Sequence, residues 1–382
     1  MKHILSLILM AFAIQAHAQW IGTWAAAAEF TGPGDMPASS LSNRSLREVI
    51  HVSIGGSELR LKISNEFSKE PVDIRSMYIA DALEGWEIQT KTAKYVTFNG
   101  KRNVTVEPGK ALYSDVIKYP LKPLQRLTVT INYGETTPVN ATSHRGSRTT
   151  SYIIPGVSKP KARFAEGEKV DHWYNIAGLE VKGSDIPCVA VLGNSITDGR
   201  GSTTNRQNRW PDFMAEALGG TVGVLNLGIG GNSVVQGGLS EPAVKRFNRD
   251  IMEQNGVNTL IIFQGVNDIG GSRHVEQTTH QLIAAYENFI KQARAKGMKV
   301  YLATITPFKG NGYFSYFHEA ARQTVNEWIR QCKQVDGIID FDELVRDPAD
   351  PMKIKEIYSD NWLHLNPAGY EAMGKYAATF IQ

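Results

Sequence analysis

The chain contains little cysteine and no metal-binding motif. Cys188 and Cys332 are the only cysteines among 382 residues, which excludes a small disulfide-stapled fold and allows at most one disulfide. Cys188 lies in an apolar segment and Cys332 follows other apolar residues at helical spacing, which favours two buried free thiols over a disulfide. With no HExxH motif, no paired cysteines and nine scattered histidines, we expect no metal site.

Long runs of like charge are also absent. The 41 Lys and Arg residues nearly balance the 38 Asp and Glu residues, and the basic residues are scattered. Nothing in this distribution points to a nucleic-acid partner. A hydrophobic content of 42% with 21% charged residues is typical of a soluble globular protein. Because one core seldom serves a chain of this length, two domains are expected.

The one long apolar run lies at the N-terminus. Basic residues at positions 2 and 3 precede "ILSLILMAFAI", and the small-residue pattern "AHA" ends at Ala18. This order predicts a secretory signal peptide over residues 1–18, cleaved before Gln19 and too short to span a membrane. No cysteine follows the run, so lipid attachment is not expected. We expect a protein without a membrane span that is secreted or periplasmic.

Between residues 19 and 184 the hydrophobic pattern has a period of two. Apolar and polar residues alternate in "LREVIHVSI" (46–54), "ELRLKIS" (58–64) and "RLTVTIN" (126–132). Alternation of this kind predicts antiparallel sheets with one face toward solvent. The expected architecture is a jelly-roll-like β-sandwich.

From residue 185 to residue 382 apolar strands alternate with helical patterns. The strand segments are "IPCVAVLG", "TVGVLNLG", "VNTLIIFQG", "KVYLATITP" and "VDGIIDF". This alternation predicts a doubly wound parallel sheet, in which ligands bind beyond the carboxyl ends of the strands. Asn366 and Pro367 should begin the last helix. Apolar residues at helical spacing predict three buried stripes: Leu282, Ala285, Tyr286, Phe289 and Ala293; Phe317, Ala321, Thr324, Val325, Trp328 and Cys332; and Tyr370, Met373, Ala377 and Phe380.

Polar residues gather where these strands end. Ser195 follows the first strand, the glycine-rich "NLGIGGNS" ends the second, "QGVNDIGG" ends the third, and "SDNWLHLNP" precedes the last helix. Taken singly, each segment is more simply explained as a turn, a cap or a solvated loop. Together they supply a hydroxyl nucleophile, an imidazole base, backbone N–H donors and a side-chain amide. That set of groups predicts acyl-transfer chemistry.

The same segments resemble the consensus blocks of the SGNH (GDSL) hydrolase superfamily of esterases and lipases. "SITDGRGSTTNRQNRWPD", "NLGIGGNSVV", "GVNDIG" and "HLNPAGYEAM" resemble its secreted bacterial branch with an N-terminal β-domain, as do "LREVIHVSIGGSELRLKISNEF" and "VTFNG". The resemblance covers nearly all of the mature chain. It implies a flavodoxin-like three-layer α/β/α hydrolase domain over residues 185–382, preceded by the β-domain over residues 19–184.

The resemblance also implies a role for each site residue. Ser195 would be the nucleophile and His364 the general base. The backbone N–H groups of Ser195 and Gly231, with the side-chain amide of Asn267, would form the oxyanion hole. No cofactor is implied. Asn194 stands where the family usually has aspartate, a mild departure because an amide can replace some of the carboxylate's hydrogen bonds.

A second departure concerns the residue that orients the histidine. The family places an aspartate three residues before it, where this chain has Asn361, while Asp360 lies four residues before His364. Asp360 could orient the imidazole in a shifted loop, Asn361 could do so as a neutral partner, or serine and histidine could act as a dyad. We favour Asp360, the only carboxylate near in sequence. Asp340 and Asp342 are more distant candidates.

Aromatic residues near the strand ends suggest a substrate. Trp362 beside His364 could stack on a sugar, and "PFKGNGYFSYF" brings further rings together at Phe308, Tyr313, Phe314, Tyr316 and Phe317. No long apolar lid segment occurs, which disfavours a triglyceride lipase. The expected protein is an exported serine esterase that removes short acyl groups, above all acetyl, from an acylated polysaccharide. The alternatives are a lipase or arylesterase of broad specificity, and a carbohydrate-binding protein with a decayed hydrolase domain.

Overall fold

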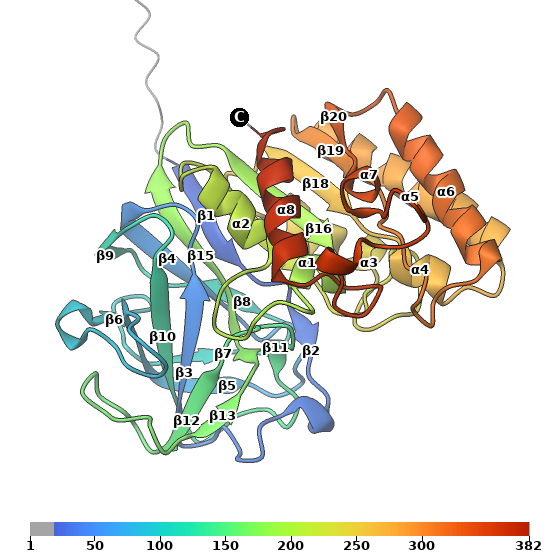
Figure 1. The fold of residues 1–382 in the computed structure, drawn as a ribbon. Helices are drawn as coiled ribbons and strands as arrows, with labels where there is room; N and C mark the ends of the chain where they lie inside the picture. Colours follow the sequence, from blue (N-terminus) through green and yellow to red (C-terminus); the bar gives the residue numbers. More distant parts are fainter. Residues whose placement is uncertain (1–18, 382) are drawn as a thin grey trace, which may run out of the picture.

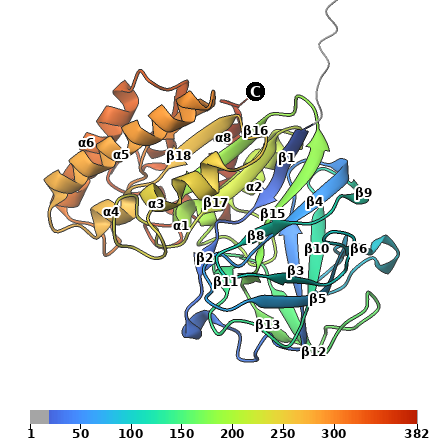
Figure 2. The same cartoon turned by 180° about the vertical axis from the view of Figure 1, so that it is seen from behind.

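The computed structural model describes residues 19–381, so the expected signal peptide at residues 1–18 lies outside the described residues. Figure 1 shows a strand-rich part beside a part in which helices surround a sheet, and the opposite view in Figure 2 shows the same two parts. The antiparallel strands end with β15 (Ile176–Gly183), and the parallel sheet begins with β16 (Cys188–Gly193). The predicted order of an antiparallel β region followed by an α/β domain is therefore confirmed. The domain boundary at residues 184 and 185 remains a prediction.

Three antiparallel sheets make up the strand-rich part within residues 19–183. The first has the order β1-β15-β4-β8, with β9 also paired to β4: β1 (Gln19–Ala25), β4 (Gly56–Ser64), β8 (Ala111–Tyr113) and β9 (Ile117–Leu121). The second has the order β13-β12-β3-β10-β5-β6, with β7 paired to β5: β3 (Arg44–His51), β5 (Val72–Asp81), β6 (Lys94–Val96), β7 (Val104–Val106), β10 (Arg126–Tyr133), β12 (Ser151–Pro155) and β13 (Glu168–Val170). The third is small: β14 (Trp173–Tyr174), β11 (Thr142–His144) and β2 (Glu29–Phe30).

The expectation that each of these sheets exposes one face is wrong for β3 and β10, which are buried on both faces. The Arg47 side chain is fully buried, and its Nε donates to Thr130 Oγ1 at 3.1 Å while a terminal nitrogen donates to the Trp86 carbonyl at 2.8 Å. Its guanidinium lies 4.0 Å from the centre of the Phe164 ring. Loops therefore cover the polar side of this sheet, and hydrogen bonds with these loops offset the cost of burying its charge. Strand β4 keeps the predicted alternation.

The second part is built on one parallel sheet of order β17-β16-β18-β19-β20. Its other strands are β17 (Gly223–Gly228), β18 (Thr259–Phe263), β19 (Lys299–Ala303) and β20 (Gly337–Ile339). This is the flavodoxin-like strand order, and it confirms the predicted doubly wound sheet. The strands β16 and β18 are buried throughout, as their continuous apolar sequences predict. All five strands end at the same edge of the sheet, where the polar segments meet.

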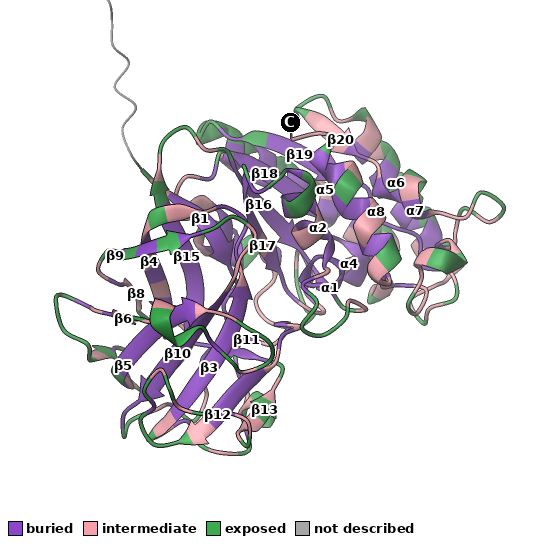
Figure 3. Cartoon of the chain, turned by 60° about the vertical axis from the view of Figure 1, so that its left-hand side comes forward, coloured by how far each residue is buried: buried purple, intermediate pink, exposed green. Residues whose placement is uncertain are grey.

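Helices cover both faces of this sheet. In Figure 1, α2 (Trp210–Ala217) packs against α8 (Pro367–Ala378) in front of the sheet, and in Figure 2, α3 (Ala243–Phe247) and α5 (Val275–Ala295) cover the other face. Figure 3 shows that exposed residues concentrate on loops and on the outer sides of the helices. The remaining helices are α1 (Ser195–Asp198), α4 (Val266–Gly270), α6 (Tyr316–Gln331) and α7 (Phe341–Val345), with short segments η1 (Pro33–Asp35), η2 (Thr90–Thr92), η3 (Asn248–Met252) and η4 (Glu356–Tyr358).

The predicted stripe of α5 is buried, and Asn366 caps α8 by accepting a hydrogen bond from the Gly369 N–H at 3.0 Å. The stripe predicted for α6 is partly wrong. Phe317 is 76% exposed and Thr324 is exposed, whereas Ala321, Val325 and Ile329 are buried. Helix α6 begins at Tyr316, directly after its cap Ser315, so Phe317 lies in the first turn, before the first buried residue of the helix.

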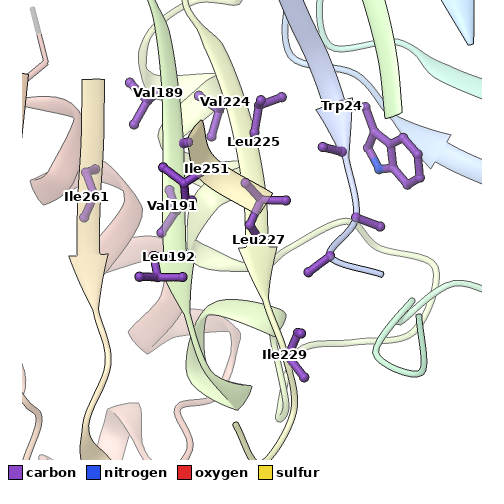
Figure 4. Packing of buried hydrophobic residues seen from close by; sticks show 14 of the residues in the cluster. Trp24, Val189, Val191, Leu192, Val224, Leu225, Leu227, Ile229, Ile251 and Ile261 are labelled. Carbon is purple, nitrogen blue, oxygen red and sulfur yellow. The ribbon is translucent and has the colours of Figure 1, made fainter. Parts of the chain in front are cut away.

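The strand-rich part packs against the free edge of the parallel sheet. Strand β1 lies beside β17, and a Cβ at Gly223 would come within 2.6 Å of the Gly22 carbonyl oxygen. Only glycine permits this approach. Figure 4 shows β1, which carries Trp24, alongside β17 with Leu225 and Leu227, and one cluster of buried hydrophobic residues extends through both parts. The two parts therefore share a core along β17, the outermost strand of the parallel sheet.

Both cysteines are free. Cys188 is buried in β16, where burial raises the pKa of its thiol, and Cys332 is partly buried after α6. Within residues 19–381 no helix is long and apolar enough to cross a membrane.

Candidate active site

Ser195 stands directly after β16, at the start of α1. The strand ends at Gly193, where a Cβ would lie 2.2 Å from Thr197 Oγ1, so the tight turn requires glycine. Asn194 caps α1 by accepting a hydrogen bond from the Ile196 N–H at 3.0 Å. The amide thus makes the kind of cap that an aspartate would make at this position.

His364 lies beside Ser195. Its Nε2 is 2.8 Å from Ser195 Oγ, which is hydrogen-bond distance for a nucleophile and its base. His364 lies in the short loop that the isolated bridge of Ser359 with Leu365 closes, three residues before α8 begins. The structure therefore brings together two residues that are 169 positions apart in the chain.

Asn361, and not Asp360, contacts the other ring nitrogen of His364. Asn361 Oδ1 lies 3.2 Å and Nδ2 lies 3.1 Å from His364 Nδ1. Asn361 Oδ1 also accepts hydrogen bonds from the backbone N–H groups of Leu363 and His364, at 3.2 and 2.9 Å. These two donors identify Oδ1 as the amide oxygen. It can therefore accept a hydrogen bond from His364 Nδ1–H, which leaves Nε2 free to take a proton from serine.

The expectation that Asp360 orients His364 is therefore corrected. The Asp360 side chain is exposed, and the Asp360 backbone N–H donates to the His364 carbonyl at 2.9 Å. This hydrogen bond turns the loop so that position 361 faces the imidazole. The more distant candidates are engaged elsewhere: Asp340 binds Arg330 and Asp342 binds Arg322.

The expected oxyanion donors line the same pocket as Ser195 and His364. Gly231 has a left-handed backbone with φ of +67°, and a Cβ there would run into Leu239 at 2.8 Å. Asn267 Nδ2 donates to the Asn232 carbonyl at 2.8 Å, and its Oδ1 accepts from the Tyr313 hydroxyl at 3.0 Å. These contacts hold the amide plane and leave its second N–H for another acceptor.

Sequence reasoning missed a wall of the pocket that comes from the strand-rich part. His144 Nε2 lies 2.8 Å from Asp198 Oδ1, and Arg148 lies 3.1 Å from Asp198 Oδ2. Between them, a Cβ at Gly146 would lie 1.9 Å from the same carboxylate. The signal was the segment "SHRGSR" (143–148), in which a histidine and two arginines surround a glycine inside a predicted sandwich.

Opposite charges are buried in this wall. Burial would raise the pKa of Asp198, but His144, Arg148 and Arg209 lower it overall. Burial would lower the pKa of His144, but the carboxylates of Asp198 and Glu29 raise it overall. His144 Nδ1 also lies 2.9 Å from the Ala27 carbonyl oxygen. Because both ring nitrogens face acceptors, the pair is an imidazolium bound to a carboxylate, and it ties β11 to α1.

The electrostatic environment of His364 differs. Burial, followed by the positive charges of Arg200 and Arg148, lowers the pKa of His364 to about 4. The imidazole is thus neutral at physiological pH, as a general base must be.

The pocket around these residues has a volume of about 310 Å³. Most of its lining residues are polar or charged: Glu29, Arg145, Arg148, Ser195, Asp198, Arg200, Asn267, Tyr313 and His364, together with Gly146, Gly230, Gly231, Leu239 and Leu363. Among residues 19–381, no group of three or more His, Cys, Asp or Glu side chains is placed to hold a metal ion. The chemistry available to the described residues is nucleophilic and acid–base.

Most of the aromatic residues expected at the rim lie elsewhere. Phe308 is buried in the core, Tyr316 and Phe317 are exposed, and Tyr313 reaches the pocket. Trp362 is not among the lining residues, and Lys353 Nζ lies 3.8 Å from the centre of its ring. A stacking role for Trp362 therefore gains no support from its position.

Comparison with known proteins now adds to the geometry. The model of the GDSL-like lipase/acylhydrolase family matches residues 191–372, the span that holds Ser195, Gly231, Asn267 and His364. Residues 191–372 belong to the GDSL-like lipase/acylhydrolase family. The GDSL-like domain is the α/β part of the molecule, and the expected superfamily membership is confirmed.

Other similarities are more distant. The uncharacterized lipoprotein YqeF of Bacillus subtilis (strain 168) is 27% identical over 206 residues, covering 49% of this chain and 75% of that protein. A carbohydrate acetylesterase from Sinorhizobium meliloti has a TM-score of 0.40 at 16% identity, covering 51% of this chain and 98% of that chain. A family two carbohydrate esterase from Clostridium thermocellum, in complex with cellohexaose, has a TM-score of 0.39 at 13% identity, covering 93% of this chain and 98% of that chain.

Proposed function

We propose that the protein is an exported serine esterase that hydrolyses acetyl and other short acyl esters of a polar alcohol, with acylated polysaccharide as its substrate class. The observation that carries this proposal is the 2.8 Å contact between Ser195 Oγ and His364 Nε2, in a pocket that Gly231 and Asn267 also line. Membership of the GDSL-like domain in an acylhydrolase family supports ester hydrolysis. Export rests on the sequence of residues 1–18.

The reaction has two halves. His364 removes the proton of Ser195 as the hydroxyl attacks the ester carbonyl, and the N–H groups of Ser195, Gly231 and Asn267 stabilise the oxyanion. The imidazolium then gives its proton to the leaving alcohol, which leaves an acyl group on Ser195. Water activated by His364 releases the carboxylic acid. Asn361 Oδ1 accepts a hydrogen bond from the His364 Nδ1–H throughout and so maintains the productive tautomer.

The pocket lining supports a short acyl group. Three arginines and two carboxylates contribute to it, while Leu239 and Leu363 are its only aliphatic residues larger than glycine. A long acyl chain would need an apolar channel to gain from burial. This argues against the alternative of a lipase. The intact contact between Ser195 and His364 argues against a decayed hydrolase domain that only binds carbohydrate.

The test is hydrolysis of p-nitrophenyl acetate and p-nitrophenyl octanoate by wild type, Ser195→Ala and His364→Ala. We expect wild type to favour the acetate, and both variants to lose nearly all activity while keeping the wild-type circular dichroism spectrum. Loss of a member of such a site reduces kcat by about 10⁴-fold or more. Preference for octanoate would instead support the lipase. Equal rates for wild type and Ser195→Ala would refute the esterase, and binding to acetylated xylan would then indicate a binding protein.

A further inference from the structure

More positive than negative charge lines the catalytic pocket. Three arginines face it, Arg145, Arg148 and Arg200, against the carboxylates of Glu29 and Asp198. Arg145 is matched, since its guanidinium binds Glu29 Oε2 at 2.6 Å. The question is what balances the other two arginines.

The Asp198 carboxylate does not balance Arg148 alone. Its Oδ1 is bound by His144, which carries a positive charge of its own, and its Oδ2 is 3.1 Å from one nitrogen of Arg148. Arg148 Nε is buried and has no hydrogen-bond partner among the described residues. Asp198 thus serves two cations, and one donor of Arg148 is left unused inside the pocket wall.

Arg200 forms no ion pair within 4 Å among residues 19–381. Its backbone is nonetheless fixed, because its N–H donates to the Ser195 carbonyl at 2.9 Å and its own carbonyl accepts a hydrogen bond from the Tyr370 hydroxyl. A cation is therefore anchored five residues after the nucleophile, at the mouth of the pocket. Its exposed side chain can reach a ligand with little loss of hydration.

Arg200 lies beside the loop that carries His364. A Cβ at Gly201, the residue after Arg200, would come within 2.2 Å of the carbonyl oxygen of Leu365, the residue after His364. Arg148 lines the same pocket as Arg200 and His364. His364 must sit next to the alcohol oxygen, because it gives that oxygen its proton. An anionic group on the alcohol would therefore lie on the side of Arg200.

Resting on the proposed function, we propose that the esterase selects esters whose alcohol carries a carboxylate, as in an O-acetylated uronic acid of an acidic polysaccharide, and that Arg200 and Arg148 bind this carboxylate. A carboxylate there would supply the negative charge that the lining lacks and an acceptor for the exposed guanidinium of Arg200. Guanidinium groups suit carboxylates because their donors match the two oxygens.

The test compares two acetyl esters of similar shape, 4-acetoxybenzoate and its neutral amide 4-acetoxybenzamide, by the appearance of the 4-hydroxy product. The enzymes are wild type, Arg200→Gln, Arg148→Gln and, as a matched control, Arg163→Gln, which changes an exposed arginine outside the pocket. The measured quantity is kcat/KM for the anionic ester divided by kcat/KM for the neutral ester. Comparing this ratio between enzymes cancels the difference in leaving-group chemistry.

We expect Arg200→Gln to lower the ratio by about tenfold relative to wild type, as loss of a charge-assisted hydrogen bond would. Arg148→Gln should lower it in the same direction, and Arg163→Gln should leave it unchanged. Added salt should lower the wild-type ratio and have less effect on Arg200→Gln.

The possible failures are distinct. If Arg200→Gln slowed both esters equally, Arg200 would stabilise the oxyanion. If neither substitution nor added salt changed the ratio, Arg200 would be a solvated arginine without a role in substrate selection. Either result overturns the inference while leaving the esterase in place. No hydrolysis of either ester by wild type, at rates above Ser195→Ala, overturns the proposed function itself.

Discussion

At the scale of single residues, Asn361 occupies the position at which the resemblance would place a carboxylate. Its amide oxygen is held by two backbone N–H groups and lies 3.2 Å from His364 Nδ1. A neutral amide can fix the tautomer of the imidazole, but it stabilises the imidazolium less than a carboxylate does. Burial and the nearby arginines lower the pKa of His364, and a neutral partner at Nδ1 adds no negative charge to oppose them.

Asn361→Asp should therefore raise the pKa of His364. A carboxylate next to a histidine favours the charged form, by about one to three pKa units. Because His364 acts as a base in its neutral form, the acidic limb of kcat/KM should move from about pH 4 toward higher pH. Turnover above that limb should increase. The measurement is the pH dependence of p-nitrophenyl acetate hydrolysis.

Asp360→Asn is the matched control, because it also exchanges a carboxylate and an amide, but one position earlier and on an exposed side chain. It should leave the pH profile as in wild type. If Asp360→Asn moved the limb and Asn361→Asp did not, the assignment of Asn361 as the partner of His364 would be wrong.

The sequence alone could identify Ser195 and His364 as candidates, because each is a reactive side chain beside a recognisable strand end or helix start. It could not decide between Asp360 and Asn361. That choice depends on the backbone hydrogen bond from Asp360 to His364, which sets the turn of the loop. A shift of one residue in a loop leaves no mark in hydrophobic periodicity.

At the scale of elements, the loop before α6 and the helix α4 together hold Asn267. Tyr313 comes from that loop, and its hydroxyl donates to the Asn267 oxygen at 3.0 Å. A Cβ at Gly270 would lie 2.2 Å from the Tyr313 ring. The last residue of α4 must therefore be glycine for the ring to approach, and the ring in turn orients the amide.

Tyr313→Phe and Gly270→Ala should both reduce kcat, because each loosens the amide of Asn267. Loss of one oxyanion donor costs about 10²- to 10³-fold, and loss of its support should cost less, about tenfold. Gly312→Ala is the control, since a Cβ there meets nothing within 4 Å. The measurement is kcat and KM, determined separately for each variant. A fall confined to kcat indicates a weaker oxyanion hole, whereas a rise confined to KM would mean that Tyr313 only binds substrate.

Periodicity predicted these elements unequally well. The prediction of five parallel strands was correct because strands buried on both faces have continuous apolar sequences. The buried stripe predicted for α6 was wrong at Phe317, because the first turn of a helix can lie beyond the part of the helix that packs on the sheet. The prediction of a solvent-exposed face on β3 was wrong because loops distant in sequence cover Arg47. A two-residue period carries no information about such loops.

At the scale of the whole molecule, the strand-rich part belongs to the catalytic unit. It packs β1 along the edge of the parallel sheet and contributes Glu29, Arg145 and Arg148 to the pocket. The predicted order of the two folds was correct, but the sequence could not show which residues the strand-rich part contributes to the shared core and the shared pocket. Both depend on close approaches between segments far apart in the chain, such as Gly22 with Gly223.

The pair of His144 and Asp198 predicts how the stability of this assembly depends on pH. The folded-state pKa of His144 is raised above its unfolded value of about 6.5. A raised pKa contributes stability that is fully present below the unfolded pKa and is lost as pH rises through the folded pKa. His144→Gln removes this contribution and leaves the Asp198 carboxylate with one cation fewer.

We therefore expect His144→Gln to lower the free energy of unfolding by roughly 3 kcal/mol near pH 6, the low end of the cost of breaking a buried ion pair. The difference between variant and wild type should shrink as the pH rises above about 6.5 and through the raised pKa of His144, because wild type then loses the charge that the variant lacks. Urea unfolding of wild type and variant over the same pH range measures the difference in their free energies of unfolding. The contributions of other titrating groups cancel in this difference. A difference that stays constant with pH would mean that His144 is neutral in the folded protein and contributes only through packing and neutral hydrogen bonds.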